Sequence, residues 1–170
     1  MLAPRAGAQA TEQSFPHFDE DFDNATKSWQ EIAVQLPVLP APDKRTLLPF
    51  EVSATATQSF AIMPETLSLG ADGVIRYVLV ARSESGAENI SYEGLRCASL
   101  EKKSYAFGHK DGTWSRSRHD GWEVVNGNGA NRQHAALAES YFCDGKIVAG
   151  NAATIVQRLK NNKPMGQPTP

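Results

Sequence analysis

This 170-residue sequence has only two cysteines, no long apolar run and no large excess of either charge. No stretch approaches the roughly 18 apolar residues of a transmembrane helix, so we expect no membrane-spanning segment. Lysine and arginine total 17 and aspartate and glutamate total 19, which leaves a net charge of -2. Because the charges are mixed along the chain, no basic surface for nucleic acid is predicted. No motif with catalytic spacing is present either.

The two cysteines, Cys97 and Cys143, are compatible with one disulfide or with two buried thiols. The first ten residues bear on this choice, because they end in Ala8-Gln9-Ala10, a pattern after which signal peptidase cleaves. No apolar segment precedes it, so either the start codon lies inside a longer export signal or the pattern is chance in an alanine-rich tail. We favour residues 1–10 as the remnant of an export signal, since an oxidising compartment also predicts the disulfide.

Residues 11–27 are polar and acidic, and we interpret them as a flexible arm. The segment does not have the glycine and terminal glutamate of an EF-hand loop, so no metal is expected there. Aromatic side chains alternate with the carboxylates, which is unusual for a purely solvated segment. The residues that we consider candidates for docking a partner are Phe15, Phe18, Asp19, Asp21 and Phe22.

Residues 28–161 predict a single domain, followed by a disordered tail at residues 162–170. Four prolines between residues 29 and 49 indicate an extended peripheral segment, with at most an edge strand at residues 31–36. Further along, Pro64 is expected to break a strand. The predicted strands span residues 50–57, 58–63, 66–69, 74–82, 89–98, 102–107, 113–118 and 122–125.

The last third of the chain predicts two helices, one at residues 130–142 and one that begins after Asn151 as its N-cap. Short turns between consecutive strands favour antiparallel pairing. The predicted fold is therefore α+β, a twisted antiparallel β-sheet with two C-terminal helices packed on it. One disulfide would join Cys143, at the end of the first helix, to Cys97 on a strand.

A candidate polar site comprises Glu93, Arg96, Asn131 and His134. An enzyme hypothesis makes His134 a base beside a Cys97 nucleophile, but a paired cysteine cannot be a nucleophile. The alternative is that His134 and Asn131 satisfy loop backbone where the helix meets the sheet. The four histidines of the chain are too scattered to predict a zinc site, and we expect no cofactor.

Four aromatic residues fall on neighbouring predicted strands, where they form either core or an open binding surface. These residues are Tyr92, Tyr105, Trp114 and Trp122.

Several ordered blocks resemble one known family. They include the step Trp29-Gln30-Glu31, the run Ser91-Tyr92-Glu93-Gly94-Leu95-Arg96-Cys97, and residues 47–50, 85–89, 105–114 and 131–143. Over about residues 20–160 the chain is similar to the cryptic neisserial protein family. The resemblance implies a small envelope protein of betaproteobacteria made with an export signal. It supplies no established activity and no catalytic residue.

Together these observations favour an exported, non-enzymatic binding or assembly module of the cell envelope. We expect it in the periplasm or at the outer membrane, where it would act by docking to a protein partner. The alternative function is a small-ligand-binding protein or a hydrolase with a polar site around His134.

Overall fold

The computed structural model describes residues 28–166, and all strands and helices lie in the compact unit that begins at Glu31. The predicted export-signal remnant at residues 1–10 and the acidic arm at residues 11–27 lie outside the described residues. No helix of the described part is long and apolar enough to cross a membrane.

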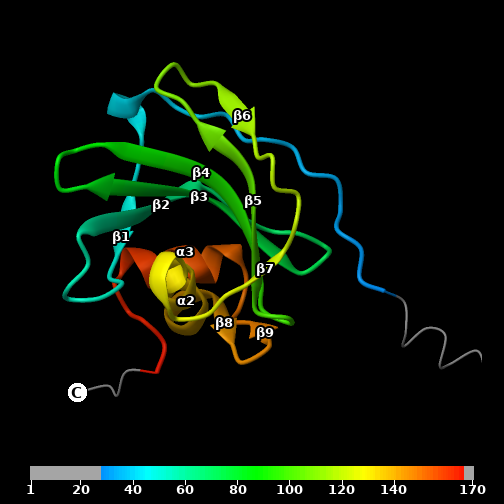
Figure 1. The fold of residues 1–170 in the computed structure, drawn as a ribbon. Coiled ribbons are helices and arrows are strands. Elements are labelled where there is room, and N and C mark those ends of the chain that lie inside the picture. The colour runs from blue at the N-terminus through cyan, green and yellow to red at the C-terminus, as the bar shows by residue number, and fades with distance from the viewer. Residues whose placement is uncertain (1–27, 167–170) are drawn as a thin grey trace, which may run out of the picture. The chain divides into compact units, whose positions relative to one another are not determined.

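The main sheet is antiparallel and connects its strands in the order β1-β2-β3-β4-β5-β6, while β7 also pairs with β5. It curves around the helices, as Figure 1 shows. The fold predicted from the sequence is thus confirmed. The strands are β1 (Leu48–Phe50), β2 (Gln58–Leu69), β3 (Val74–Ser83), β4 (Glu88–Arg96), β5 (Glu101–Gly108), β6 (Trp114–Arg116) and β7 (Glu123–Val124).

Strand β2 continues through Pro64, where the sequence predicted a break. Its pairing with β3 changes register between Met63 and Ser68. At this irregularity the Thr66 hydroxyl accepts a hydrogen bond from the Val78 amide at 2.9 Å and donates one to the Met63 carbonyl at 2.7 Å. A proline is tolerated here because a bulge already interrupts the ladder and a side chain replaces the missing backbone partner.

The first predicted helix is a continuous run of three short elements, namely η2 (Gly129–Asn131), α2 (Arg132–Leu137) and the π-helical turn η3 (Ala138–Phe142). A small hairpin of β8 (Cys143–Asp144) and β9 (Ile147–Val148) then leads to helix α3 (Ala152–Lys160). Asn151 is the N-cap of α3 as predicted, because its side chain accepts a hydrogen bond from the Thr154 amide at 2.9 Å.

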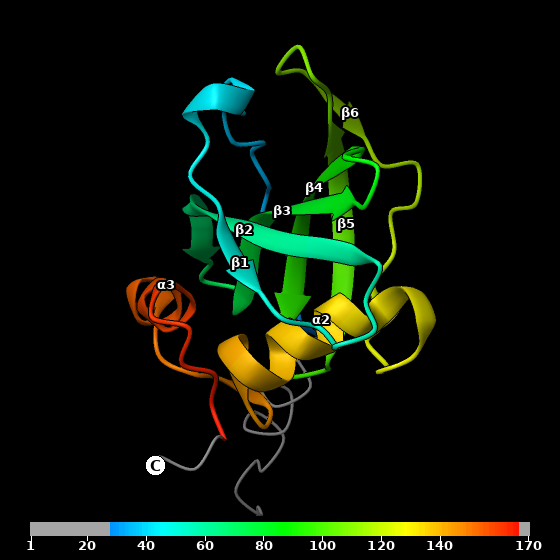
Figure 2. The same ribbon diagram turned by 90° about the vertical axis from the view of Figure 1, so that its left-hand side faces the viewer.

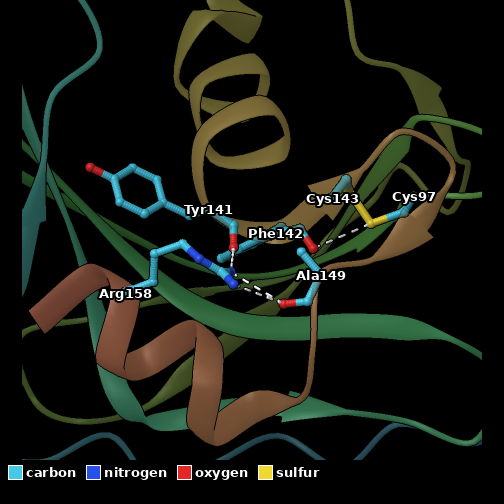
Figure 3. Close-up of a disulfide and its surroundings, with 6 residues drawn as sticks. All are labelled: Cys97, Tyr141, Phe142, Cys143, Ala149 and Arg158. Atoms are coloured by element: carbon cyan, nitrogen blue, oxygen red, sulfur yellow. Dashed lines mark hydrogen bonds between the residues drawn. A yellow bond between two sulfur atoms is a disulfide. The ribbon is translucent and has the colours of Figure 1, made fainter. Parts of the chain in front are cut away.

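Both helices cover one face of the sheet, which we call the helix-covered face (Figure 2). Arg158 of α3 fixes the end of the π-helical turn (Figure 3). Its guanidinium donates to the Tyr141 carbonyl at 2.5 Å and to the Ala149 carbonyl at 3.2 Å. The first bond satisfies a carbonyl group that a helix end leaves without an intrahelical partner, and the second holds the connection between β9 and α3. The core on this face includes Phe60, Ile62, Ile75, Tyr77, Leu79, Leu95, Leu137, Phe142, Ile155 and Leu159.

The predicted disulfide between Cys97 and Cys143 is present, with a Cα–Cα distance of 5.5 Å. It is buried, and the Cys97 sulfur lies 3.8 Å from the Phe142 carbonyl oxygen. The bond ties the residue after β4 to the residue after η3. It therefore joins the sheet to the helical layer, as expected.

The opposite face is covered by residues 31–47, which we call the strap. The edge strand that the sequence allowed at residues 31–36 does not form, since the strap contains only the short turn η1 (Pro42–Lys44) and joins no sheet. Leu39 is buried, and the strap runs along the outer side of the sheet (Figure 1). The core on this face comprises Leu39, Met63, Val78, Val80, Ile90, Tyr92 and Tyr105. We call this surface the strap-covered face.

Replacing both cysteines by alanine should lower the free energy of unfolding by about 4 kcal/mol. The disulfide closes a loop of 46 residues, and its removal restores that much conformational entropy to the unfolded chain. Urea unfolding followed by tryptophan fluorescence measures the change. A variant whose stability equals that of the wild type would show that the bond contributes nothing to the join between the two layers.

Candidate functional site

A buried polar cluster lies between α2 and the sheet, with the Glu93 carboxylate at its centre. Ser91 Oγ donates to Glu93 Oε1 at 2.8 Å, and the Tyr77 hydroxyl donates to Oε2 at 3.2 Å. His134 Nε2 lies 2.6 Å from the same Oε2. The side chains of Glu93 and His134 are only 6% and 4% exposed. One carboxylate thus accepts hydrogen bonds from two strands and one helix.

Strand register brings these groups together. Tyr77 on β3 pairs with Glu93 on β4, and Ser91 stands two residues earlier on the same face of β4. His134 reaches them from α2, which lies over this face. The polar site predicted from the sequence included Glu93 and His134 but not Ser91 or Tyr77, and the role of Tyr77 depends on the pairing of two strands.

The electrostatics of the cluster favour an ionised Glu93. Burial by itself would raise the pKa of Glu93, but the charge and hydrogen bond of His134, with the bond from Ser91, bring it below its ordinary value. Burial, followed by the nearby Glu93 carboxylate, raises the pKa of Tyr77 well above its ordinary value. An ionised carboxylate only accepts hydrogen bonds, so His134 Nε2 is the donor in its hydrogen bond with Glu93.

The cluster has no opening toward the hollows that flank the helices. A hollow of about 750 Å³ lies between the β1–β2 connection and residues 162–166, and its lining includes Phe60, Tyr141 and Met165. A second, of about 310 Å³, reaches the start of α2 through Arg132 and Gln133. Neither is lined by Glu93 or His134. A molecule bound in either of these hollows would therefore not contact Glu93 or His134.

The other two residues of the predicted polar site have separate roles. Arg96 pairs with Glu101, with Nη1 and Oε2 3.5 Å apart, and its guanidinium lies 6.0 Å from the centre of the Trp122 ring. Asn131 precedes α2 and forms no side-chain cap there. His134 is likewise bonded to a carboxylate rather than to loop backbone.

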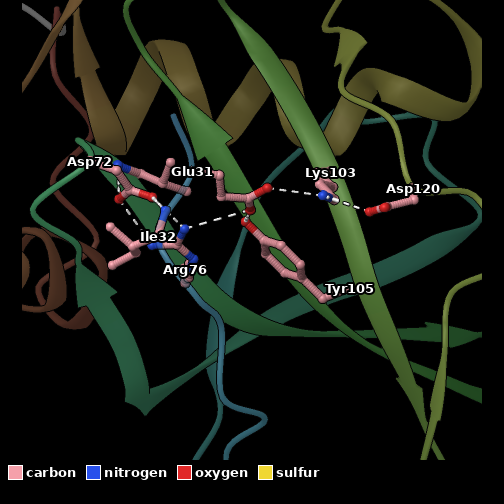
Figure 4. A network of polar contacts seen from close by, with 8 residues as sticks. Glu31, Ile32, Asp72, Arg76, Lys103, Tyr105 and Asp120 are labelled. Atoms are coloured by element: carbon pink, nitrogen blue, oxygen red, sulfur yellow. Dashed lines mark hydrogen bonds and ion pairs between the residues drawn. The ribbon is translucent and has the colours of Figure 1, made fainter. Parts of the chain in front are cut away.

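A second polar cluster, which sequence reasoning missed, fixes the beginning of the strap (Figure 4). One Glu31 oxygen accepts a hydrogen bond from the Tyr105 hydroxyl at 2.5 Å, and the other lies 2.9 Å from Lys103 Nζ. Arg76 lies 3.6 Å from Glu31 and holds Asp72 through two hydrogen bonds of 2.6 and 3.1 Å. These charges come from segments far apart in sequence, so no spacing pattern could reveal them.

Asp72 also accepts a hydrogen bond from the Ile32 amide at 3.1 Å, which places the strap directly on the cluster. Burial disfavours the Arg76 charge, yet the hydrogen bond with Asp72 raises the pKa of Arg76 above its ordinary value. Burial and then the bond to Glu31 raise the pKa of Tyr105. The cluster therefore combines charged side chains with the neutral phenol of Tyr105.

Three of the four predicted aromatic residues meet under the strap. The ring centres of Tyr92 and Tyr105 are 5.5 Å apart, and those of Tyr92 and Trp114 are 6.3 Å apart. The Trp114 indole donates a hydrogen bond to the Pro37 carbonyl at 2.8 Å. The Trp122 ring instead lies beside the Arg96 guanidinium. These three rings therefore belong to the core of the strap-covered face, and Trp114 also forms a specific contact with the strap.

The model of the CNP1-like family matches residues 24–160, which is most of the sequence. The chain belongs to the CNP1-like family. It is 29% identical to Cryptic neisserial protein 1 of Neisseria gonorrhoeae (strain ATCC 700825 / FA 1090) over 150 residues, covering 80% of this chain and 73% of the relative. The resemblance seen in the sequence is therefore confirmed. No solved structure matches the chain.

Substituting leucine for His134 should lower the free energy of unfolding by about 3–5 kcal/mol, because it leaves the buried Glu93 charge without its partner. Replacing both residues of the pair by leucine should cost less than the sum of the two single changes, since no unpaired charge remains. Chemical denaturation of the four proteins of this cycle measures the coupling. His109→Ala, at an exposed histidine, should change stability by no more than about 0.5 kcal/mol. If the changes in unfolding free energy of the two single variants add up to that of the double variant, the pairing is contradicted.

Stability should also depend on the Glu93 charge as the solution is acidified. The folded pKa of Glu93 lies below its unfolded value of about 4.3, so the ionised group stabilises the fold above that pH. This stabilisation is lost as the pH falls through the folded pKa. The difference in unfolding free energy between wild type and Glu93→Gln should accordingly shrink between about pH 5 and pH 3. Urea titrations across this range test it, with the exposed Glu139→Gln as control, and a constant difference would contradict it.

Proposed function

We propose that this protein is an exported, non-enzymatic binding or assembly module of the cell envelope that acts by docking to another protein. The observation that carries the proposal is the burial of the Glu93–His134 pair. These residues are the histidine and the carboxylate of the predicted polar site, and they are bonded to one another beneath α2. Catalysis would require one of them to reach a substrate.

The disulfide supports the exported location. Disulfides persist in oxidising compartments such as the periplasm and are rare in the cytosol. Cys97 and Cys143 join two layers of the fold, so the bond contributes to the domain itself. A protein folded with this bond is suited to the periplasm or to the periplasmic side of the outer membrane.

The outer edge of β1 is one surface open to a partner strand, since among the described strands β1 ends the sheet and pairs only with β2. It spans three residues and includes Pro49, which has no amide hydrogen to donate. A partner adding to this edge would form few backbone hydrogen bonds. Docking therefore depends mainly on side-chain contacts elsewhere on the domain.

Crosslinking in living cells tests the proposal. An affinity-tagged copy is expressed in cells of its source, treated with a short amine crosslinker, and captured from the envelope fraction. The expected result is one abundant envelope protein joined in stoichiometric amount, because a docking module has a dedicated partner. The same protein bearing the tag but left without crosslinker is the control. Recovery of the protein alone, or of two free thiols in the native protein, would contradict the proposal.

A further inference from the structure

Residues 35–41 of the strap are buried with a period of three residues. From Gln35 to Ala41 the exposed positions are the first, fourth and seventh, and Val38 is 87% exposed. A β-strand buries alternate residues, whereas a polyproline II helix has three residues per turn. Ala41 has φ -55° and ψ 148°, close to the polyproline II values. Residues 35–41 of the strap thus lie on the sheet with the periodicity of a polyproline II segment.

Its sequence has the spacing that suits this conformation. Pro37 and Pro40 are three residues apart and half-buried, so they share one side of the helix. Leu39 points into the strap-covered face, where it is only 6% exposed. Gly108 makes room for it, since a Cβ there would come 2.9 Å from Leu39 Cδ2.

The surface beneath has the chemistry that recognises such segments. Proline-rich peptides bind to aromatic-lined grooves, where their carbonyls accept hydrogen bonds because prolines provide no amide donors. Tyr92, Tyr105 and Trp114 supply the rings here, and the Trp114 indole donates to the Pro37 carbonyl at 2.8 Å. The proline-bearing segment and the aromatic surface that contacts it are therefore both present within one chain.

We infer that the strap-covered face is a polyproline-binding surface that the strap occupies in cis, and that a proline-rich segment of a partner protein with the same Pro-x-x-Pro spacing binds there when the strap is displaced. This inference rests on the proposed docking function and names its site and the class of its partner. The strap itself shows which ligand chemistry the surface accepts.

The way in which the strap is attached permits its displacement. Among the described residues, no backbone–backbone hydrogen bond joins the strap to the sheet, so no β-ladder has to be broken. At one end Glu31 and the Ile32 amide bind the charged cluster. At the other end Arg45 donates to the Pro40 carbonyl at 2.9 Å and lies 3.5 Å from Glu88. Side-chain contacts hold both ends.

Because the strap already occupies the surface, a proline-rich segment of a partner must compete with it. A tethered segment acts at an effective concentration on the order of millimolar, so a free peptide binds the wild-type surface weakly. Weakening the strap without altering the aromatic groove should expose the site. Leu39→Ala removes the buried anchor of the strap, and Glu31→Gln weakens its charged attachment.

The test is a fluorescence anisotropy titration of the full chain with a labelled peptide of residues 33–42. Leu39→Ala should bind the peptide at least about tenfold more tightly than the wild type does, because the competing segment is loosened. Adding Trp114→Phe to that variant should weaken binding about fivefold through the lost hydrogen bond. A peptide carrying Pro37→Ala and Pro40→Ala is the matched control and should bind at least tenfold more weakly than the native peptide.

Thermal unfolding first establishes that each variant is folded, and Glu31→Gln serves as the loosened protein if Leu39→Ala is not. Equal peptide binding by wild-type and loosened proteins, or equal binding of the two peptides, would overturn the inference. A wild-type dimer that dissociates in Leu39→Ala would also overturn it, because the occupant in trans would then be the strap of a second copy.

The outcomes of the two proposals can be separated. A partner captured in cells together with a negative peptide titration would retain the docking function and reject this surface as its site. Specific peptide binding without any captured partner would support the polyproline surface and reject the assembly role. Crosslinks that map to Lys110, in the turn just before Trp114, would support both.

Discussion

Strand β3 is buried on both of its faces, and the rest of the architecture follows from that constraint. Every residue from Val74 to Val80 is buried, so side chains that are apolar except for Arg76 project from the two sides of the sheet in alternation. A sheet with two apolar faces needs a cover on each. The helices supply one, and the strap supplies the other.

The two covers are attached differently, and this difference bears on function. The helical layer is joined to the sheet by a disulfide, by Arg158 and by the buried Glu93–His134 pair. The strap is held by side-chain contacts at its ends and by one indole hydrogen bond in its middle. The helix-covered face is consequently the permanent core, whereas the strap-covered face is the one that a competing peptide can reach.

Polar groups buried in this fold serve to position elements. Glu93 links two strands and a helix, and Arg76 links Asp72 to the start of the strap. Buried charges are retained only when they are paired and hydrogen-bonded, and removing one partner is costly. Such pairs specify where α2 and the strap lie on an apolar surface that alone would tolerate several placements.

The sequence by itself determined the elements whose causes are local. Short turns between consecutive strands predicted the antiparallel pairing, and the side chain of Asn151 predicted the start of α3. The two cysteines, taken with the export pattern at residues 1–10, predicted the disulfide. Tertiary structure alone decided the continuation of β2 past Pro64, where the Thr66 hydroxyl replaces a backbone partner. It also decided the partner of His134, the charged cluster at Glu31 and the course of the strap. These features join groups up to 77 residues apart, as in the bond from Trp114 to Pro37, and such contacts depend on strand register and sheet curvature rather than on neighbouring residues.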